Sequence, residues 1–482
     1  MSTRPTPTSS GRADGPVLAV LAATQFLLIL DAAIVNVALA SVGRDLGVSP
    51  SGLTWVVNAY VLAFGGLLLL GGRLADHVGA RQTFLAGLGV FAAASLTGAL
   101  AVNPAMLVVA RAVQGAGAAL AAPAVLALVM TLFAQGPARH RALGLLGAAA
   151  GAGGASGLVL GGLLTQTLGW RSVLWINVPV VLVIVAVAVR ALPPVARRAT
   201  HAGFDVAGAV TATAGLSVLV YAVVDAAEAG WTSGRTLALA AAAVLLLAGF
   251  VAVESRVARP LVPLGFLRRR ATAGPNLVAA LGQMAMFPMW FLLALQLQQV
   301  HGHGPLVTGL AITPLVAVLV AMNTATPRVL ARFGLLAPIV TGLALAGLGL
   351  AWFAGLGPDA GYTSWLAPLV VTGLGFGLAY VASIVAATVD VPEDKAGLAS
   401  GLVNTAQQLG GAVGLALALS VATATAGDAP TVAALSDGYT DGLAVAAGFA
   451  FAAAATAYVV LRARRGAAAG SEPDGRQDTV AA

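Results

Sequence analysis

The sequence predicts an all-α integral membrane protein of about fourteen transmembrane helices, arranged as two bundles of six with two extra helices between them. The 482 residues are 59% hydrophobic and only 9% charged, whereas soluble domains carry about 25% charged residues. Apolar stretches of about twenty residues recur along the chain, and each can cross the hydrocarbon core of a bilayer as a helix. The 59 glycines suit membrane helices that pack closely.

The spans fall into three groups along the chain. A polar segment, 1–16, is rich in Ser, Thr and Pro and is expected to be disordered in the cytoplasm. The N-terminal bundle, 17–192, holds six spans, at about 17–40, 51–72, 82–102, 105–133, 142–167 and 172–192. A region with basic linkers, 193–273, holds the two extra spans, at about 205–227 and 236–254. The C-terminal bundle, 274–461, holds six spans, at about 274–300, 308–327, 336–357, 364–389, 397–425 and 441–461. A polar cytoplasmic tail, 462–482, follows it and is expected to be disordered.

The basic residues agree with this arrangement. With the N-terminus in the cytoplasm, only three of the 25 Arg and Lys residues fall on the outer side, Arg44, Arg171 and Arg235, and Arg111 lies within a span. The others fall in cytoplasmic segments or at their edges, as the positive-inside rule requires. We therefore expect both termini in the cytoplasm, and the net charge of +7 reflects topology rather than nucleic-acid binding. The preference for Arg over Lys, with high Ala and Gly, indicates a bacterial cytoplasmic (inner) membrane.

The first span, VLAVLAATQFLLILDAAIVNVALA, contains one carboxylate, Asp31. An aspartate near the centre of a membrane helix costs about 2.5–3.5 kcal/mol on insertion scales, so it should face protein or trapped water. Thr24 lies two turns earlier on the same face, which indicates a polar stripe turned inward. Two interpretations remain open: Asp31 is a titratable group on a transport route, or it is a carboxylate held permanently by a cation.

Arg111, in the fourth span, is the candidate partner of Asp31. Arg111 lies roughly 10 Å from the outer end of its helix and Asp31 roughly 14 Å from the outer end of its own, at 1.5 Å per residue. The two side chains can therefore meet at one level of the membrane. Gln114 is three residues after Arg111 and shares its helix face.

An internal repeat relates the two bundles. GRLADHVG (72–79) follows the second span, and PRVLARFG (327–334) follows the second span of the last six. Arg73 aligns with Arg328 and Gly79 with Gly334. Two related six-helix halves, with a binding site between them, are an arrangement that secondary transporters use.

These stretches resemble the major facilitator superfamily, and within it the fourteen-helix drug:proton antiporters. GGRLADHVGARQ (71–82) is similar to the loop motif Gly-x-Leu-Ala-Asp-Arg-x-Gly-Arg-Lys of that superfamily, and LVVARAVQGAGAA (107–119) to its motif of a buried Arg followed by Gln-Gly. GLLGAAAGAGGASGLVLGGLL (144–164) resembles the antiporter signature, with Leu158 where a proline is expected. LDAAIVNVALA (30–40) and GWRSVLWINVP (169–179) resemble segments of the fourteen-helix group.

The resemblance and the residue patterns together assign roles to particular side chains. Asp31 and Arg111 are expected to couple protons to transport, and a conformational latch is expected at Gly72, Arg73, Asp76, Gly79 and Arg81. Close helix packing in the antiporter motif is expected at Gly153, Gly157, Gly161 and Gly162. The candidate pocket residues are Thr24, Asn58, Tyr60, Gln114, Gln283, Asn404, Gln407 and Gln408.

The expected function is export of hydrophobic or amphipathic small molecules, driven by protons, by a monomer without a cofactor. The alternative is a transporter of the same fold for a specific metabolite, nutrient or siderophore. An integral membrane transferase is a distant alternative, because the only clustered acids, Asp390, Glu393 and Asp394, sit in a loop between spans. Cysteine is absent, which excludes thiolate sites. His301 and His303 lack a third ligand nearby, so no metal site is expected. We also expect no enzymatic activity.

Overall fold

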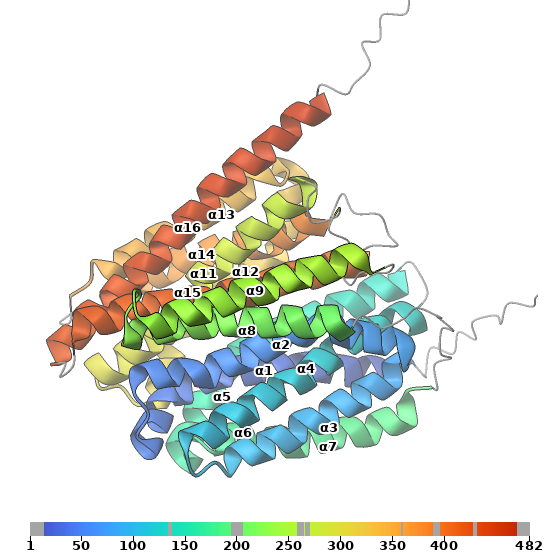
Figure 1. Ribbon diagram of the computed structural model, residues 1–482, viewed down its shortest axis with the longest axis horizontal. Helices are drawn as coiled ribbons and strands as arrows, with labels where there is room; N and C mark the ends of the chain where they lie inside the picture. The colour runs from blue at the N-terminus through green and yellow to red at the C-terminus, as the bar shows by residue number, and fades with distance from the viewer. Residues whose placement is uncertain are drawn as a thin grey trace, which may run out of the picture.

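The computed structural model describes residues 14–133, 137–193, 206–257, 265, 270–357, 360–388, 396–427 and 431–469. Within these ranges every regular element is a helix, and the long helices run alongside one another (Figure 1). Twelve helical stretches of the described chain are long and apolar enough to cross a membrane. Two shorter apolar stretches, Gly52–Leu68 and Val210–Val223, lie within α2 (Pro50–His77) and α8 (Val206–Ala229). The prediction of an all-α membrane protein with about fourteen spans is confirmed.

The N-terminal bundle starts its helices with clear local signals. Ser49 precedes α2 and Asn103 precedes α4 (Pro104–Leu132), and each side chain accepts a hydrogen bond from a backbone N–H of the first turn. A proline follows each cap, where its missing N–H costs no helical hydrogen bond. The predicted sixth span is divided at Ile176 into two helices. The other helices of this bundle are α1 (Asp14–Leu46), α3 (Ala80–Ala99), α5 (Pro137–Leu168), α6 (Ser172–Trp175) and α7 (Asn177–Ala191).

The two extra helices, α8 and α9 (Gly234–Arg256), form a hairpin that touches both bundles. Figure 1 shows them in green, between the blue N-terminal helices and the orange α15 (Ala396–Ala426). α8 packs against α2 on one side and α15 on the other. The Thr213 hydroxyl donates a hydrogen bond of 2.9 Å to the Gly66 carbonyl of α2. The hairpin therefore covers the seam at which α2 of the N-terminal bundle meets α15 of the C-terminal bundle.

The C-terminal bundle contains a change of helix type near one end. α11 (Arg270–Leu295) continues directly into a π-helical turn, η1 (Gln296–Val300). From this turn the Gln298 amide donates a hydrogen bond of 3.0 Å to the Val37 carbonyl of α1, so it joins the two halves. The remaining helices of this bundle are α12 (Pro305–Phe333), α13 (Leu336–Ala354), α14 (Tyr362–Thr388), α15 and α16 (Val432–Ala469).

Glycines bring the halves together along a second seam, between α5 and α12. A Cβ at Gly162 would lie 2.5 Å from the Pro305 carbonyl oxygen, and a Cβ at Gly309 would lie 2.4 Å from that of Leu158. Real Cβ atoms do not approach so closely, so only glycine allows this contact. Leu158, at the position where the family motif expects proline, is buried in this seam.

The internal repeat has a counterpart in backbone geometry. Gly79 joins α2 to α3 with φ of 108°, and Gly334 joins α12 to α13 with φ of 69°. Both values lie in the left-handed region that favours glycine. The two aligned loops therefore turn on the same residue type in the same kind of conformation.

Two predicted boundaries are wrong by a few residues. α1 begins at Asp14, within the segment predicted to be disordered, and Pro16 lies in its first turn, where proline is tolerated. α16 extends to Ala469, past the predicted end of the last span at 461, because its end is rich in Ala and Arg, which are strong helix formers. The rest of the predicted disordered ends, 1–13 and 470–482, and much of the first basic linker lie outside the described residues.

Candidate functional site

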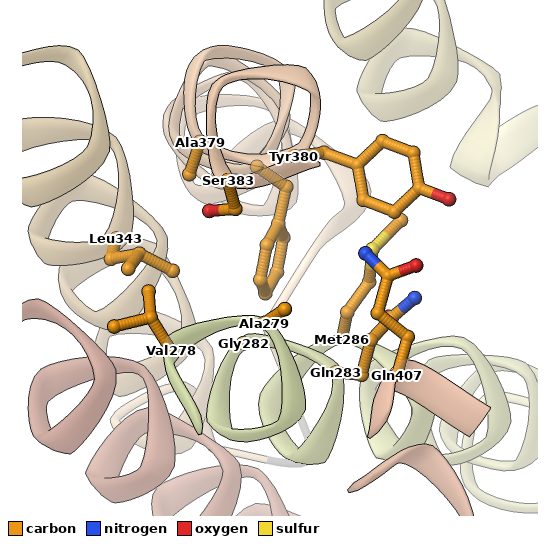
Figure 2. Close-up of a pocket in the computed structure, with 11 residues that line it drawn as sticks. Val278, Ala279, Gly282, Gln283, Met286, Leu343, Ala379, Tyr380, Ser383 and Gln407 are labelled. Atoms are coloured by element: carbon orange, nitrogen blue, oxygen red, sulfur yellow. The ribbon is translucent and has the colours of Figure 1, made fainter. Parts of the chain in front are cut away.

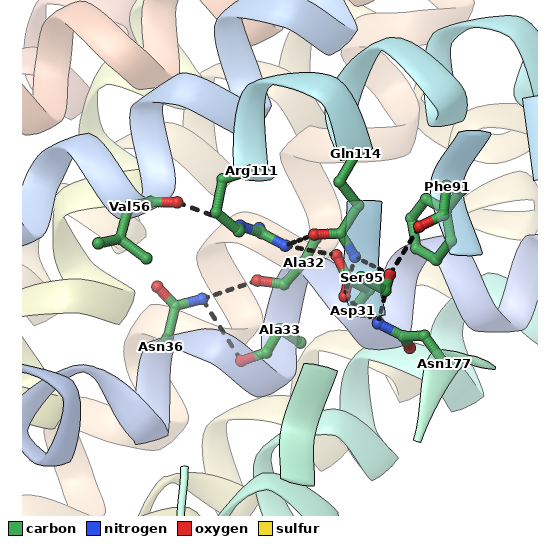
Figure 3. Close-up of polar contacts among 10 residues, drawn as sticks. All are labelled: Asp31, Ala32, Ala33, Asn36, Val56, Phe91, Ser95, Arg111, Gln114 and Asn177. Carbon is green, nitrogen blue, oxygen red and sulfur yellow. Dashed lines mark hydrogen bonds and ion pairs between the residues drawn. The ribbon is translucent and has the colours of Figure 1, made fainter. Parts of the chain in front are cut away.

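Asp31 lies completely buried inside the N-terminal bundle, where three side chains donate hydrogen bonds to its carboxylate (Figure 3). Arg111 Nη1 is 2.8 Å from Oδ2. Gln114 Nε2 is 2.8 Å from Oδ1, and Asn177 Nδ2 is 2.6 Å from the same oxygen. The predicted meeting of Asp31 and Arg111 therefore occurs, with two amides as additional donors.

Arg111 is equally enclosed, with 2% of its side chain exposed. Nε donates a hydrogen bond of 3.1 Å to the Val56 carbonyl of α2, and Nη1 also donates to Gln114 Oε1 at 2.6 Å. The guanidinium lies over the Tyr60 ring, 4.4 Å from its centre, which is within the range of a cation–π interaction. The cation thus has partners on α1, α2 and α4.

Ser95 completes the cluster from α3. Its hydroxyl accepts a hydrogen bond of 2.8 Å from Gln114 Nε2 and donates one of 2.8 Å to the Phe91 carbonyl. Asn177 Nδ2 lies 3.4 Å from the same hydroxyl. The acid–base cluster, defined as Asp31, Ser95, Arg111, Gln114 and Asn177, therefore draws side chains from α1, α3, α4 and α7 (Figure 3).

Two members of the acid–base cluster, Ser95 and Asn177, were not predicted from the sequence. Asn177 belongs to the segment GWRSVLWINVP, where it is a polar residue in an apolar run entering a helix. A polar residue at such a position is unusual, so Asn177 could have been identified from the sequence. Ser95 resembles the many small hydroxyl residues that bond only to their own helix, so the sequence carried no comparable signal for it.

In a buried ion pair of this kind, the free-energy cost of desolvating the two charges opposes the gain from their attraction. Removing two charges from water costs several kcal/mol per ion, and only close contact with additional hydrogen bonds offsets that cost. Here the carboxylate has three side-chain donors, and the guanidinium has a carbonyl, an amide oxygen and an aromatic face. Loss of either charge would leave the other buried without its counterion.

The glycines of the antiporter motif pack against the helix that carries Asp31. A Cβ at Gly153 would lie 2.5 Å from the Phe26 carbonyl oxygen, and one at Gly161 would lie 2.7 Å from that of Ile34. Between them, a Cβ at Gly157 would lie 2.7 Å from the Ala33 Cβ. α5 therefore offers a smooth face along α1 on both sides of Asp31, whereas Gly162 turns toward α12 instead.

The structure describes only part of the predicted latch. Gly79 provides the positive-φ turn, and Gly72 packs near Pro123, with a built Cβ 3.8 Å from its ring. Arg81 Nη2 donates a hydrogen bond of 2.9 Å to the Val189 carbonyl at the end of α7. The side chains of Arg73 and Asp76 lie outside the described part of the chain.

A separate small pocket, with a volume of about 20 Å³ that would hold about one water molecule, lies in the C-terminal bundle (Figure 2). Gln283 and Gln407, two of the predicted pocket residues, line it. The pocket receives further residues from α11, α13 and α14, namely Val278, Ala279, Gly282, Met286, Leu343, Phe376, Ala379, Tyr380 and Ser383. Asp31 is not among the residues that line this pocket.

The other predicted pocket residues do not line this pocket. Gln114 and Tyr60 contact the ion pair between Asp31 and Arg111. Thr24 is buried and donates to the Val20 carbonyl of its own helix. Asn58 is fully buried, and neither amide atom has a hydrogen-bond partner among the described residues. On α15, Asn404 is exposed and Gln408 lies against Gly65 of α2, with its Cβ 2.7 Å from a Cβ built there.

Comparison with known proteins identifies the family. The family model described as the Major Facilitator Superfamily matches residues 21–415. The puromycin resistance protein pur8 of Streptomyces alboniger is 41% identical over 464 residues, which cover 94% of this chain and 92% of that protein. The cephamycin export protein CmcT of Amycolatopsis lactamdurans is 43% identical over 408 residues, covering 83% and 84%.

Solved structures agree at the level of the fold. The crystal structure of an auto-inhibited POT family peptide transporter matches with a TM-score of 0.70 at 18% identity, covering 94% of this chain and 97% of that chain. At this identity the likeness concerns the fold alone. The family match, the relatives and the helical architecture lead to one conclusion: this chain belongs to the Major Facilitator Superfamily of membrane transporters.

Proposed function

We propose that this protein exports hydrophobic or amphipathic small molecules, such as antibiotics, across the bacterial cytoplasmic membrane in exchange for protons. It acts as a monomer with both termini in the cytoplasm, and its two halves open alternately to either side. The names of its relatives support this cargo class, since they include resistance and export proteins for puromycin, cephamycin, tetracenomycin and lincomycin. A specific metabolite of similar polarity remains the second candidate cargo.

The observation that carries the proposal is the complete burial of the ion pair between Asp31 and Arg111. Ionisable residues within membrane spans commonly mark proton or ion paths. A buried carboxylate that loses its cation takes up a proton rather than remaining charged in an apolar surrounding. Movement of α4 relative to α1 would separate the pair, so Asp31 would gain its proton in one conformation and release it in another.

The surroundings of the ion pair allow such movement. Val56, Tyr60 and Gln114 remain available to Arg111 when Asp31 is neutral. The glycine face of α5 lets α1 shift without side chains that interlock. The predicted latch at Gly72, Arg73, Asp76, Gly79 and Arg81 would hold the loop between α2 and α3 in one conformation and release it in the other.

Transport by the purified protein in liposomes with an imposed pH gradient tests the proposal. We expect puromycin to accumulate only while the gradient is present and to leak out when a protonophore is added. Asp31→Asn should reduce this accumulation by roughly tenfold, within the range found when two binding sites are coupled. Accumulation that persists without a proton gradient would contradict proton exchange.

Asp437→Asn provides the matched control. Asp437 lies exposed on α16 and receives the same change of charge, so its variant should accumulate puromycin normally. Equal losses in both variants would indicate that Asp31 has no particular role in coupling.

A further inference from the structure

Asn177 is fully buried at the start of α7, and only one end of its amide forms hydrogen bonds. Nδ2 lies 2.6 Å from Asp31 Oδ1 and 3.4 Å from the Ser95 hydroxyl. Oδ1 has no hydrogen-bond partner among the described residues. Figure 3 shows the amide nitrogen directed toward Asp31 and the oxygen on the side away from it.

Gln114, the other amide beside Asp31, is held in one orientation. Its Oε1 accepts a hydrogen bond of 2.6 Å from Arg111 Nη1, and its Nε2 donates to Asp31 Oδ1 and to the Ser95 hydroxyl, each at 2.8 Å. If this amide were reversed, its NH₂ group would face the guanidinium and its oxygen would face the carboxylate. Both ends would then lose their hydrogen bonds.

A proton on Asp31 changes what the carboxyl group requires. A carboxylate only accepts hydrogen bonds, whereas a neutral carboxyl group also has one O–H to donate. Oδ2 faces the Arg111 guanidinium, so the proton binds to Oδ1, which faces the amide nitrogens of Gln114 and Asn177. Both nitrogens are donors, so the buried O–H lacks an acceptor unless one amide turns, and an unsatisfied buried donor costs free energy.

Asn177 is the amide that can turn. The torsion about its Cβ–Cγ bond is broad and roughly two-fold. A half-turn exchanges the two amide atoms, so Oδ1 takes the position 2.6 Å from Asp31 Oδ1, a normal length for an O–H···O hydrogen bond. The turn gives up the longer contact with Ser95 and breaks no hydrogen bond of Oδ1. Because Asn177 belongs to α7, it also stays beside Asp31 when α4 withdraws Arg111 and Gln114.

The surroundings of Asp31 leave this response to a single titrating carboxyl group. Among its described neighbours, the side chains that carry or can gain a charge are Arg111 on α4 and Tyr60 on α2. α3 and α7 contribute Ser95 and Asn177, and the adjoining face of α5 contributes glycines, none of which titrates.

We propose that Asn177 is a positioning residue that holds Asp31 in both protonation states. Its Nδ2 donates to the carboxylate, and after a half-turn of the amide its Oδ1 accepts the O–H of the neutral carboxyl group. The proton from water adds to Asp31 Oδ1, and Asn177 itself neither gains nor loses a proton. The proposal rests on the proposed proton exchange, because it identifies the partner of Asp31 in its neutral state.

Infrared difference spectroscopy of the purified full-length protein in lipid nanodiscs, without cargo or a pH gradient, tests this proposal. An isotope label at the side-chain carbonyl of asparagine separates its bands from those of the backbone. As the pH is lowered, the wild type should gain the carbonyl band of a protonated carboxyl group, and one asparagine carbonyl band should shift to lower wavenumber. A carbonyl group that accepts a hydrogen bond vibrates at lower frequency than a free one, so this shift detects the new bond to Oδ1.

Variants assign the two signals to their residues. Asp31→Asn should lose both, since asparagine does not titrate. Asn177→Leu should lose the asparagine shift, and its carboxyl band should move to higher wavenumber because the O–H has no acceptor. Asn177→Ala, which should also lose the asparagine shift, replaces it if the leucine variant does not fold. Asn36→Leu is the matched control, because Asn36 lies on α1 and donates to the Ala32 and Ala33 carbonyls of its own helix (Figure 3), so both signals should remain.

The proposal is overturned if the carboxyl band appears without an asparagine shift, which would mean that Oδ1 has the same surroundings in both states. It is also overturned if the shift survives Asp31→Asn or the Asn177 variants, or if Asn36→Leu removes it. Absence of the carboxyl band would overturn this proposal and proton exchange at Asp31 together. If both signals appear but transport ignores the proton gradient, proton exchange is refuted and the role of Asn177 stands.

Discussion

At the scale of single residues, the buried polar side chains of the candidate site form hydrogen bonds to the Asp31 carboxylate. Asp31, Arg111 and Gln114 could be selected from the sequence, because polar groups inside apolar spans are rare and carry a free-energy cost. Asn177 and Ser95 contact the same carboxylate or its amide partner, but they come from α7 and α3. Their contribution depends on how four helices, α1, α3, α4 and α7, are placed relative to one another, which no local pattern specifies.

The ion pair gives a stability prediction at this scale. Arg111→Met should destabilise the protein by about 3–5 kcal/mol, the cost of breaking a buried ion pair by removing one partner. Asp31 must then take up a proton and loses its strongest hydrogen-bond donor. The double variant Asp31→Asn with Arg111→Met removes both charges and should recover most of that loss. Thermal unfolding of the variants in detergent measures both effects.

A double variant as unstable as Arg111→Met alone would contradict this argument. It would mean that Arg111 stabilises the bundle through Tyr60 and the Val56 carbonyl rather than through the charge of Asp31.

At the scale of elements, the contact between α1 and α5 restricts which residues α5 can carry, because side chains larger than glycine would clash with α1. The spacing of Gly153, Gly157 and Gly161 predicted a groove for close helix contact, and the structure identifies its partner as the part of α1 on either side of Asp31. The helix that carries Asp31 thus lies close to a face of α5 on which three glycines present no Cβ.

Substitution within this face tests its importance. Gly157→Leu should destabilise the protein by about 1–3 kcal/mol through overpacking and should slow export, since its side chain would meet Ala33 and the Leu30 carbonyl. Gly147→Leu on the same helix is the control, because nothing lies within 4 Å of a Cβ there. Unfolding and transport are measured on both, and equal behaviour would argue against a special role for the α1–α5 contact.

At the scale of the whole molecule, the two halves meet through α2 with α15 and α5 with α12, and α8 covers one of these seams. The hydrogen bond from Gln298 to the Val37 carbonyl adds a contact near the loop between α11 and α12. Alternating access requires some of these contacts to break during each cycle.

The absence of cysteine from the native chain makes this requirement testable. Gln166 on α5 is exposed, and its amide oxygen lies 3.4 Å from a Cβ built at Gly304, just before α12. In the variant with both Gln166→Cys and Gly304→Cys, a short thiol cross-linker should stop export, and a reducing agent should restore it. Each single variant, treated in the same way, should remain active, and a cross-linked protein that transports normally would contradict separation of the halves at this end.

The sequence by itself determined the membrane class, the helical spans and the repeat, because the bilayer imposes length and hydropathy on each helix separately. It also selected Asp31 and Arg111, since a charge in a span is exceptional wherever that helix lies. Only the tertiary structure decided which helices supply Asn177 and Ser95, that the glycines of α5 face α1, and that Gln283 and Gln407 line a pocket while Asn404 does not. In lipid the apolar faces of a helix are nearly equivalent in hydropathy, so small residues and a few hydrogen bonds, rather than burial of apolar surface, decide which face meets which neighbour.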